Sequence, residues 1–257
     1  MNRKVNWNRL AQVAVVLLVA LGLKQYYSTA SANQLRWILA PTTMLVSLVS
    51  GESFQFESYA GYITSDHTFV IAAACAGVNF LITAFLMLCL RKLWVEESAA
   101  APKSAEAAKV AWRFIPTAAL VAYLATLVAN AVRITVALQL QRTPPQIGTF
   151  GPGELHRFEG IFVYFGFLLL LFVISERGRT KSSSRLLSLS VFPLLIYYLT
   201  TLGIPLANSA YRQKLVDGDF WEHFVFVLLT PLIFIVPVAA FRHWSSRYHS
   251  LRFARNR

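Results

Sequence analysis

Seven long apolar stretches divide this chain, and they constrain its fold more than any other feature of the sequence. Most of them approach the ~20 residues that an α-helix needs to cross the hydrocarbon core of a bilayer. Composition agrees, because 56% of the 257 residues are hydrophobic and only 14% are charged, which is too few for a water-soluble surface. The stretches cover residues 10–27, 35–49, 68–90, 114–131, 161–174, 186–206 and 224–241.

We therefore expect an all-α fold, a polytopic transmembrane helix bundle of six to eight helices that forms a single integral membrane domain over residues 1–257. The second stretch is short and contains Pro41, which predicts a half-span or a tilted, kinked helix. The first stretch lacks a clear cleavage site, so we interpret it as a retained segment rather than a signal peptide. The Ala-, Lys- and Glu-rich linker at residues 96–109 predicts a solvated, partly helical loop.

Basic residues alternate between the loops and predict the topology. They fill the loops at residues 91–113 and 177–185 and the tail after residue 241, whereas residues 51–67 contain no Lys or Arg. By the positive-inside rule the basic segments are cytoplasmic, and residues 51–67, 141–157 and 207–222 face outward. The net charge of +12 is explained by this topology rather than by nucleic-acid binding, because the basic residues form no patch interleaved with aromatic residues.

The N-terminal region does not fit this alternation. Basic residues flank the first apolar stretch on both sides, with Arg9 before it and Lys24 and Arg36 at or after its end. Either the N-terminus lies outside, or one of the first two stretches does not cross the membrane.

Three chemically reactive residues converge at the predicted outer face. Cys75 lies near the outer end of the third helix, Arg133 at the outer end of the fourth, and His156 in the loop before the fifth. Helices adjacent in sequence usually pack together, and ionisable residues at this depth are costly and frequently functional. An imidazole can activate a thiol nucleophile, and a guanidinium can stabilise the oxyanion of an acyl-transfer intermediate. The pattern is typical of a cysteine peptidase or transpeptidase.

Simpler interpretations exist for each residue type. A cysteine within an apolar run is usually a small hydrophobic residue, which is our interpretation of Cys89. An interfacial arginine such as Arg133 often reaches for lipid phosphates. A non-catalytic membrane assembly or scaffold protein would tolerate loss of all three residues. A small-solute transporter would place ionisable residues near the bilayer midplane within repeated halves, and neither feature is visible.

The sequence around these residues resembles the exosortase/archaeosortase family. Ala-Cys-Ala-Gly-Val around Cys75 resembles the Cys-Ser/Ala-Gly signature of that family. Asn-Ala-Val-Arg-Ile at residues 130–134 resembles its Asn-x-x-Arg-Ile element, and His156 with Gly160 before an apolar run resembles its histidine motif. The motifs occur in the family's order with similar spacing, and the short chain is similar to a subfamily such as exosortase K.

The resemblance covers about residues 35–175, which it marks as the catalytic core, and leaves a C-terminal helix pair at about residues 186–241 that we expect to serve substrate specificity. Ala76 stands where many members have Ser. Family members lie in the cytoplasmic membrane with the active site facing the periplasm or the cell exterior. They cleave the C-terminal sorting signals of exported proteins, best known as the PEP-CTERM type, which combine a short motif, a transmembrane helix and a basic tail.

The resemblance assigns Cys75 as the nucleophile, His156 as the general acid and base, and Arg133 as the stabiliser of the oxyanion or substrate. Asn130, three residues before Arg133, shares its helical face and is a supporting residue. Gly77 either allows a substrate strand to approach closely or packs between helices. We expect no cofactor or metal, because no His-x-x-x-His motif or carboxylate cluster exists to hold one. The expected partners are membrane lipid, exported proteins with such signals, and an acceptor that the sequence does not name.

Overall fold

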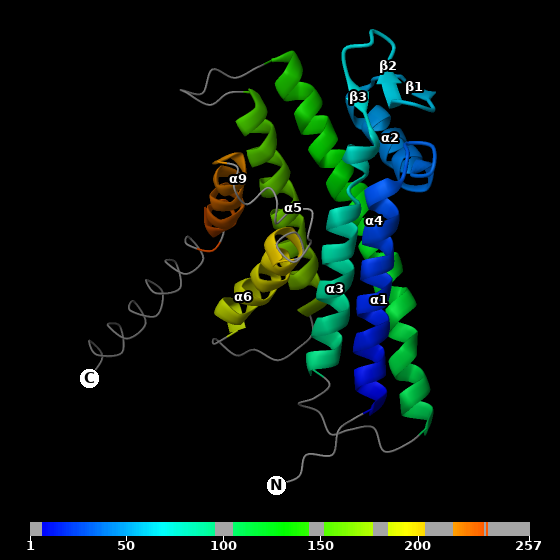
Figure 1. The fold of residues 1–257 in the computed structure, drawn as a ribbon, viewed down its shortest axis with the longest axis vertical. Coiled ribbons are helices and arrows are strands. Elements are labelled where there is room, and N and C mark those ends of the chain that lie inside the picture. Colours follow the sequence, from blue (N-terminus) through cyan, green and yellow to red (C-terminus); the bar gives the residue numbers. More distant parts are fainter. Residues whose placement is uncertain are drawn as a thin grey trace, which may run out of the picture. The chain divides into compact units, whose positions relative to one another are not determined.

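The computed structural model describes residues 7–95, 105–143, 152–176, 185–203, 218–233 and 235, and these residues are mostly helical (Figure 1). The chain divides into two compact units, Met1–Phe167 and Leu168–Arg257, and each is described by itself.

The first unit is built on long helices: α1 (Trp7–Thr29), α3 (Val78–Val95), α4 (Ala105–Arg142) and α5 (Pro152–Glu176), the last of which continues into the second unit. In Figure 1, α1, α3 and α4 run side by side. Four segments in the described residues are long and apolar enough to cross a membrane, which fits a membrane protein. The expected bundle of six to eight membrane-spanning helices stays a prediction. The segments are Trp7–Thr29, Ala73–Leu93, Trp112–Arg142 and Leu155–Glu176.

The helix formed by the second apolar stretch, α2 (Arg36–Ser50), is too short to cross a bilayer. Its 15 residues span roughly 22 Å at the α-helical rise. The chain turns back directly after α1, where the Tyr26 hydroxyl donates a hydrogen bond to the Gln34 carbonyl at 2.8 Å. At its other end, α2 stops at Gly51, which adopts the left-handed conformation with φ 75°. From there the chain enters a small sheet, so both ends of α2 lead to the same end of the unit.

The first residues of α1 lie at the opposite end of this unit. There the Trp112 indole N–H donates to the Asn8 side-chain oxygen at 3.1 Å, which places the start of α1 beside the first span-forming turns of α4. Of the two alternatives that the sequence left open, this geometry favours the one in which the second stretch does not cross.

A three-stranded antiparallel sheet follows α2 and was not among the expected elements. Its strands are β1 (Phe54–Glu57), β2 (Gly61–Thr64) and β3 (Val70–Ile71), in the order β1-β2-β3, with Phe54 opposite Thr64. Gly61 has φ 120°, and a Cβ there would lie 2.3 Å from the Ile71 carbonyl oxygen, so a side chain would not fit. β3 occupies the start of the third apolar stretch, and the expectation of helix from residue 68 is wrong there.

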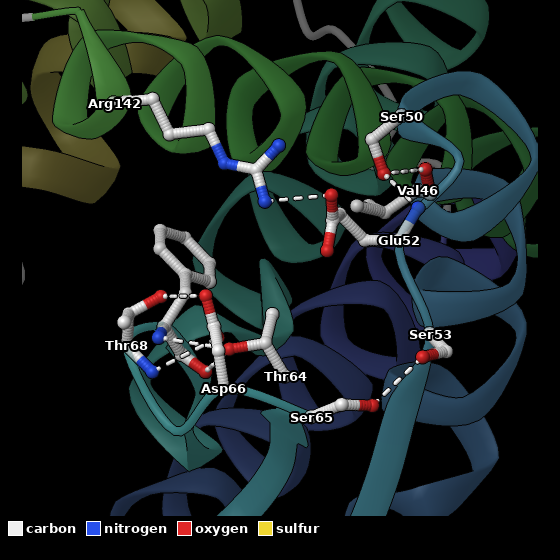
Figure 2. Close-up of polar contacts among 10 residues, drawn as sticks. Val46, Ser50, Glu52, Ser53, Thr64, Ser65, Asp66, Thr68 and Arg142 are labelled. Carbon is white, nitrogen blue, oxygen red and sulfur yellow. Dashed lines mark hydrogen bonds and ion pairs between the residues drawn. The ribbon is translucent and has the colours of Figure 1, made fainter.

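Two polar side chains at the end of α4 contact the sheet region. Residues 51–72 are called the sheet cap below. Figure 2 shows the ion pair between Arg142 of α4 and Glu52, 2.6 Å long. The neighbouring Gln141 donates to the Thr68 carbonyl at 2.9 Å. An exposed ion pair contributes little by itself. Two contacts from consecutive residues of one helix nevertheless fix where the cap lies along that helix.

The second unit contains α6 (Arg185–Tyr198), a π-helical turn η2 (Leu199–Gly203) and α9 (Gly218–Leu229). The Tyr198 hydroxyl donates to the Leu228 carbonyl and links α6 to α9. The sixth apolar stretch is helical where it is described, and the seventh is helical through Leu229 and then turns at residues 230–231. Residues 204–206, 234 and 236–241 of those stretches lie outside the described residues. In the linker at 96–109, residues 96–104 are also outside, and Ala105 begins α4.

The stability of the turn between β2 and β3 should depend on pH through the Asp66 carboxylate. Hydrogen bonds from the Thr64 side chain, and then from the backbone and side chain of Thr68, lower the pKa of Asp66 from 3.8 to about 2. A lowered pKa means that the ionised carboxylate stabilises the turn above about pH 4 and that this contribution disappears as the pH falls through about 2. Asp66→Asn should therefore speed hydrogen exchange of the Thr68 amide, relative to the unmodified protein, at about pH 7.

The comparison is made at matched pH so that intrinsic exchange rates cancel. The ratio between variant and unmodified protein should fall toward one as the pH approaches about 2, where about half of the Asp66 carboxylates are protonated. An equal ratio at both pH values would show that the Asp66 charge does not support the turn.

Candidate active site

Cys75 lies on a separate 3-10 turn, η1 (Ala73–Ala76), between β3 and α3. The expectation that it belongs to the outer end of the third helix is corrected here, because α3 begins only at Val78. Its backbone N–H donates to the Ala72 carbonyl at 2.8 Å, and the Tyr27 hydroxyl donates to the Ala74 carbonyl at 3.3 Å. The residue is half-buried. The thiol is thus carried by a short turn that α1 contacts through Tyr27.

Gly77 ends this turn and allows a close contact with α4. It adopts the left-handed conformation, φ 71°, which favours glycine. A Cβ at this position would lie 3.1 Å from Cγ of Asn130. Of the two alternatives for Gly77, approach of a substrate strand or packing between helices, the structure shows close packing against the Asn130 side chain of α4.

The Asn130 amide joins three elements. Its Nδ2 donates to the Cys75 carbonyl at 2.6 Å, and its Oδ1 accepts from the Tyr164 hydroxyl at 2.7 Å. The residue is 0% exposed, so both bonds form away from solvent. Asn130 therefore connects η1, α4 and α5 at the level of the thiol.

Arg133 lies at the centre of the polar cluster. Its Nη1 donates to the Tyr164 hydroxyl at 3.3 Å, and its Nη2 lies 3.2 Å from Nε2 of His156. It is also close enough to interact electrostatically with the Cys75 thiol. The expectation that Arg133 ends the fourth helix is wrong, since α4 continues for nine residues to Arg142, or about 13 Å.

His156 lies inside α5 rather than in the loop before it. The helix begins at Pro152, a favoured residue for a first helical position because its missing N–H would have no helical partner there. Gly151 lies outside the described residues, and Pro152 and Gly153 belong to the first turn of α5. The imidazole side chain is 53% exposed, and within the described residues its Nε2 contacts Arg133.

The sequence analysis missed two residues of this cluster, Glu159 and Tyr164. His156, Gly160 and Tyr164 are spaced four residues apart and form one stripe along α5. Gly160 leaves room for Arg133, because a Cβ there would lie 3.4 Å from the arginine Nε. Glu159 is buried, and its carboxylate lies 3.4 Å from Nδ1 of His156. The i,i+3 spacing of an acid after a histidine, directly before an apolar run, was the signal that could have identified it.

The structure thus brings together the predicted residues. Cys75, Asn130, Arg133 and His156 are linked through shared hydrogen bonds or electrostatic contact, and Gly77 makes the approach possible. Cys89, by contrast, is fully buried in α3 and is 0% exposed. Comparisons of the chain with protein families, with characterised proteins and with solved structures return no match.

Two substitutions at Gly160 test whether Arg133 influences the Cys75 thiol. Gly160→Ala adds a methyl group at ordinary contact distance from Arg133 and should leave the cluster intact. Gly160→Val introduces branches that compete with the guanidinium for this space. We expect the valine variant to slow alkylation of Cys75 by roughly threefold or more, because it displaces the guanidinium that interacts electrostatically with this residue.

Alkylation by iodoacetamide is measured in a Cys89→Ala background, so that Cys75 is the single thiol. Wild-type rates in both glycine variants would mean that Arg133 does not influence the thiol.

Proposed function

We propose that this protein is a membrane-embedded cysteine peptidase or transpeptidase of the exosortase/archaeosortase type. The observation that carries the proposal is Arg133, which contacts His156 and Tyr164 at 3.2 and 3.3 Å and interacts electrostatically with Cys75. A nucleophile, a base and a fixed cation in one cluster are the parts that acyl transfer needs.

In the proposed reaction the Cys75 thiol transfers its proton to Nε2 of His156 while sulfur attacks the carbonyl carbon of the scissile peptide bond. The new C–S bond displaces the carbonyl π electrons onto oxygen, and Arg133 stabilises that oxyanion. Collapse breaks the C–N bond, and the leaving amine takes the proton from Nε2. The resulting thioester is resolved by water or by an amine acceptor, and His156 serves as the base for that second attack.

This reaction requires a change of partner at His156. In the substrate-free arrangement Nε2 faces Arg133, and its single lone pair cannot serve the guanidinium and the thiol together. Release of Arg133 toward the oxyanion would free Nε2 for the thiol in the same movement. Catalytic hydrogen bonds often form only in the substrate complex, which is consistent with this exchange.

The proposed substrates are exported proteins with a short C-terminal motif, a transmembrane helix and a basic tail. The enzyme would lie in the cell membrane as a bundle of six to eight helices, with Cys75 at the periplasmic or outer face and the C-terminus in the cytoplasm. A helical substrate could reach the cluster through lipid, since α1 exposes apolar side chains such as Leu18 and Leu21. A scaffold protein is the main alternative, and it predicts that the cluster can be removed without loss of function.

A variant series tests the catalytic proposal with a candidate substrate that carries such a signal. Cys75→Ala should abolish processing, because no other residue of the cluster can form the thioester, while Cys89→Ala should behave as wild type. Arg133→Lys keeps the charge but loses the planar donors, so it should slow processing on the order of a hundredfold or more. Processing is followed by the mass of the substrate and by a Cys75 thioester adduct.

His156→Ala should cost on the order of 10²–10⁴ in rate, since the base and the leaving-group acid are both lost. All variants should insert in the membrane at normal abundance. Normal processing by Arg133→Lys would remove the oxyanion role and leave a lipid-contact role, because lysine also reaches for phosphates. An active Cys75→Ala protein would refute the enzyme and favour the scaffold.

The proposed orientation is tested by labelling single cysteines in a background without Cys75 and Cys89. Tyr59 in the sheet cap is 85% exposed and Trp7 at the start of α1 is 73% exposed, and the two lie at opposite ends of the unit. Tyr59→Cys should react with a membrane-impermeant maleimide in intact cells, and Trp7→Cys only after permeabilisation. The reverse pattern would place the active site in the cytoplasm.

A further inference from the structure

Glu159 is a buried carboxylate that the proposed reaction does not yet use. It is 6% exposed, and neither carboxylate oxygen has a hydrogen-bond partner among the described residues. A buried carboxylate in an apolar helix is costly unless nearby groups compensate its charge. Among the described residues, His156 Nδ1 lies 3.4 Å from Oε2, and Arg133 interacts with Glu159 electrostatically.

The contacts of His156 determine which ring nitrogen carries the proton. A guanidinium has only donors, so at the 3.2 Å contact Arg133 must donate and Nε2 of His156 must accept. A neutral imidazole with an acceptor at Nε2 carries its proton on Nδ1. That nitrogen is the one that faces the Glu159 carboxylate. The donor and acceptor pattern thus favours one tautomer from both sides of the ring.

We propose that Glu159 is a positioning residue that holds the Nδ1–H tautomer of His156 and so keeps the Nε2 lone pair directed at the catalytic cluster. This inference rests on the proposed function. It adds a carboxylate to the cysteine, histidine and arginine that the sequence motifs supplied. The 3.4 Å separation is longer than a good hydrogen bond and would shorten once the ring becomes charged.

The need for Glu159 follows from the change of partner at Nε2. At rest Arg133 and Glu159 both favour the Nδ1–H tautomer. When Arg133 moves to the oxyanion, Glu159 alone keeps the proton on Nδ1, at the moment when Nε2 must accept the thiol proton. The imidazolium that forms then lies beside a carboxylate, which stabilises its charge.

A purely structural role for Glu159, as a counter-charge to Arg133, makes a different prediction. In that role the carboxylate matters only while the guanidinium is present, and the tautomer of His156 does not depend on it. The two roles are separated by removing Arg133 first.

The experiment records ¹⁵N spectra of the full-length protein in lipid, with histidine labelled and His67, His223, His243 and His249 replaced so that His156 alone reports. Spectra are taken at about pH 8, where a free imidazole is neutral. Arg133→Met, which has no donor, should keep the Nδ1–H tautomer because Glu159 remains. Adding Glu159→Ala to Arg133→Met should give a mixture of both tautomers. An unchanged tautomer population in the double variant would overturn the positioning role.

An activity measurement on the single variant completes the test and does not depend on how well the Arg133 variants accumulate. Glu159→Ala should lower kcat roughly tenfold to a hundredfold with little change in KM, a part of the ~10²–10⁴-fold that acid–base catalysis supplies. Glu176→Ala, which removes a carboxylate from the same helix, is the matched control and should process normally. Wild-type kcat in Glu159→Ala would also overturn the inference. If Cys75→Ala proved active, the proposed function would fail, while the tautomer comparison would still decide whether Glu159 controls His156.

Discussion

The arrangement of the site depends on two hydrogen bonds made by the buried side-chain amide of Asn130. One side of the amide donates to the Cys75 carbonyl and the other accepts from Tyr164, so a single planar group sets the distance between η1, α4 and α5. Each such bond contributes about 0.5–1.5 kcal/mol net, but an unpaired buried partner costs about 1–3 kcal/mol. Within a bilayer water cannot substitute for either partner. The turn that carries the thiol is thereby coupled to the helix that carries the arginine.

Helix α4 extends this control beyond the site. The same helix supplies Asn130 and Arg133 to the cluster and, about three turns later, Gln141 and Arg142 to the sheet cap. The cap leads through β3 directly into η1, so Cys75 is fixed from both sides by one rigid element. α4 is longer than the apolar pattern implied, and its polar last turn contacts the sheet cap.

The sequence predicted the helices well where apolar runs were long, and it predicted the cluster through Cys75, Arg133 and His156. It failed where structure depends on partners distant in the chain. The alternation of Phe54 and Phe56 with polar residues indicates a strand, but four residues between apolar helices are too few to stand out. Tyr164 is indistinguishable from an ordinary interfacial aromatic residue until Gly160 and Arg133 are seen beside it. Glu159 could have been found, because a carboxylate three residues after a histidine shares its helical face.

The direction of the hydrogen bonds around Arg133 has a consequence for proton traffic. Arg133 contacts His156 on one side and the hydrogen-bonded pair Tyr164–Asn130 on the other. A guanidinium retains its protons at any relevant pH and accepts none, so no proton passes through Arg133 from one side to the other. The Tyr164–Asn130 pair thus has a structural role and exchanges no proton with His156 through Arg133. A proton taken up by His156 exchanges with water through the half-exposed imidazole. Proton exchange at the cluster is consequently confined to the exposed side of His156, and the buried hydrogen bond between Tyr164 and Asn130 takes no part in it.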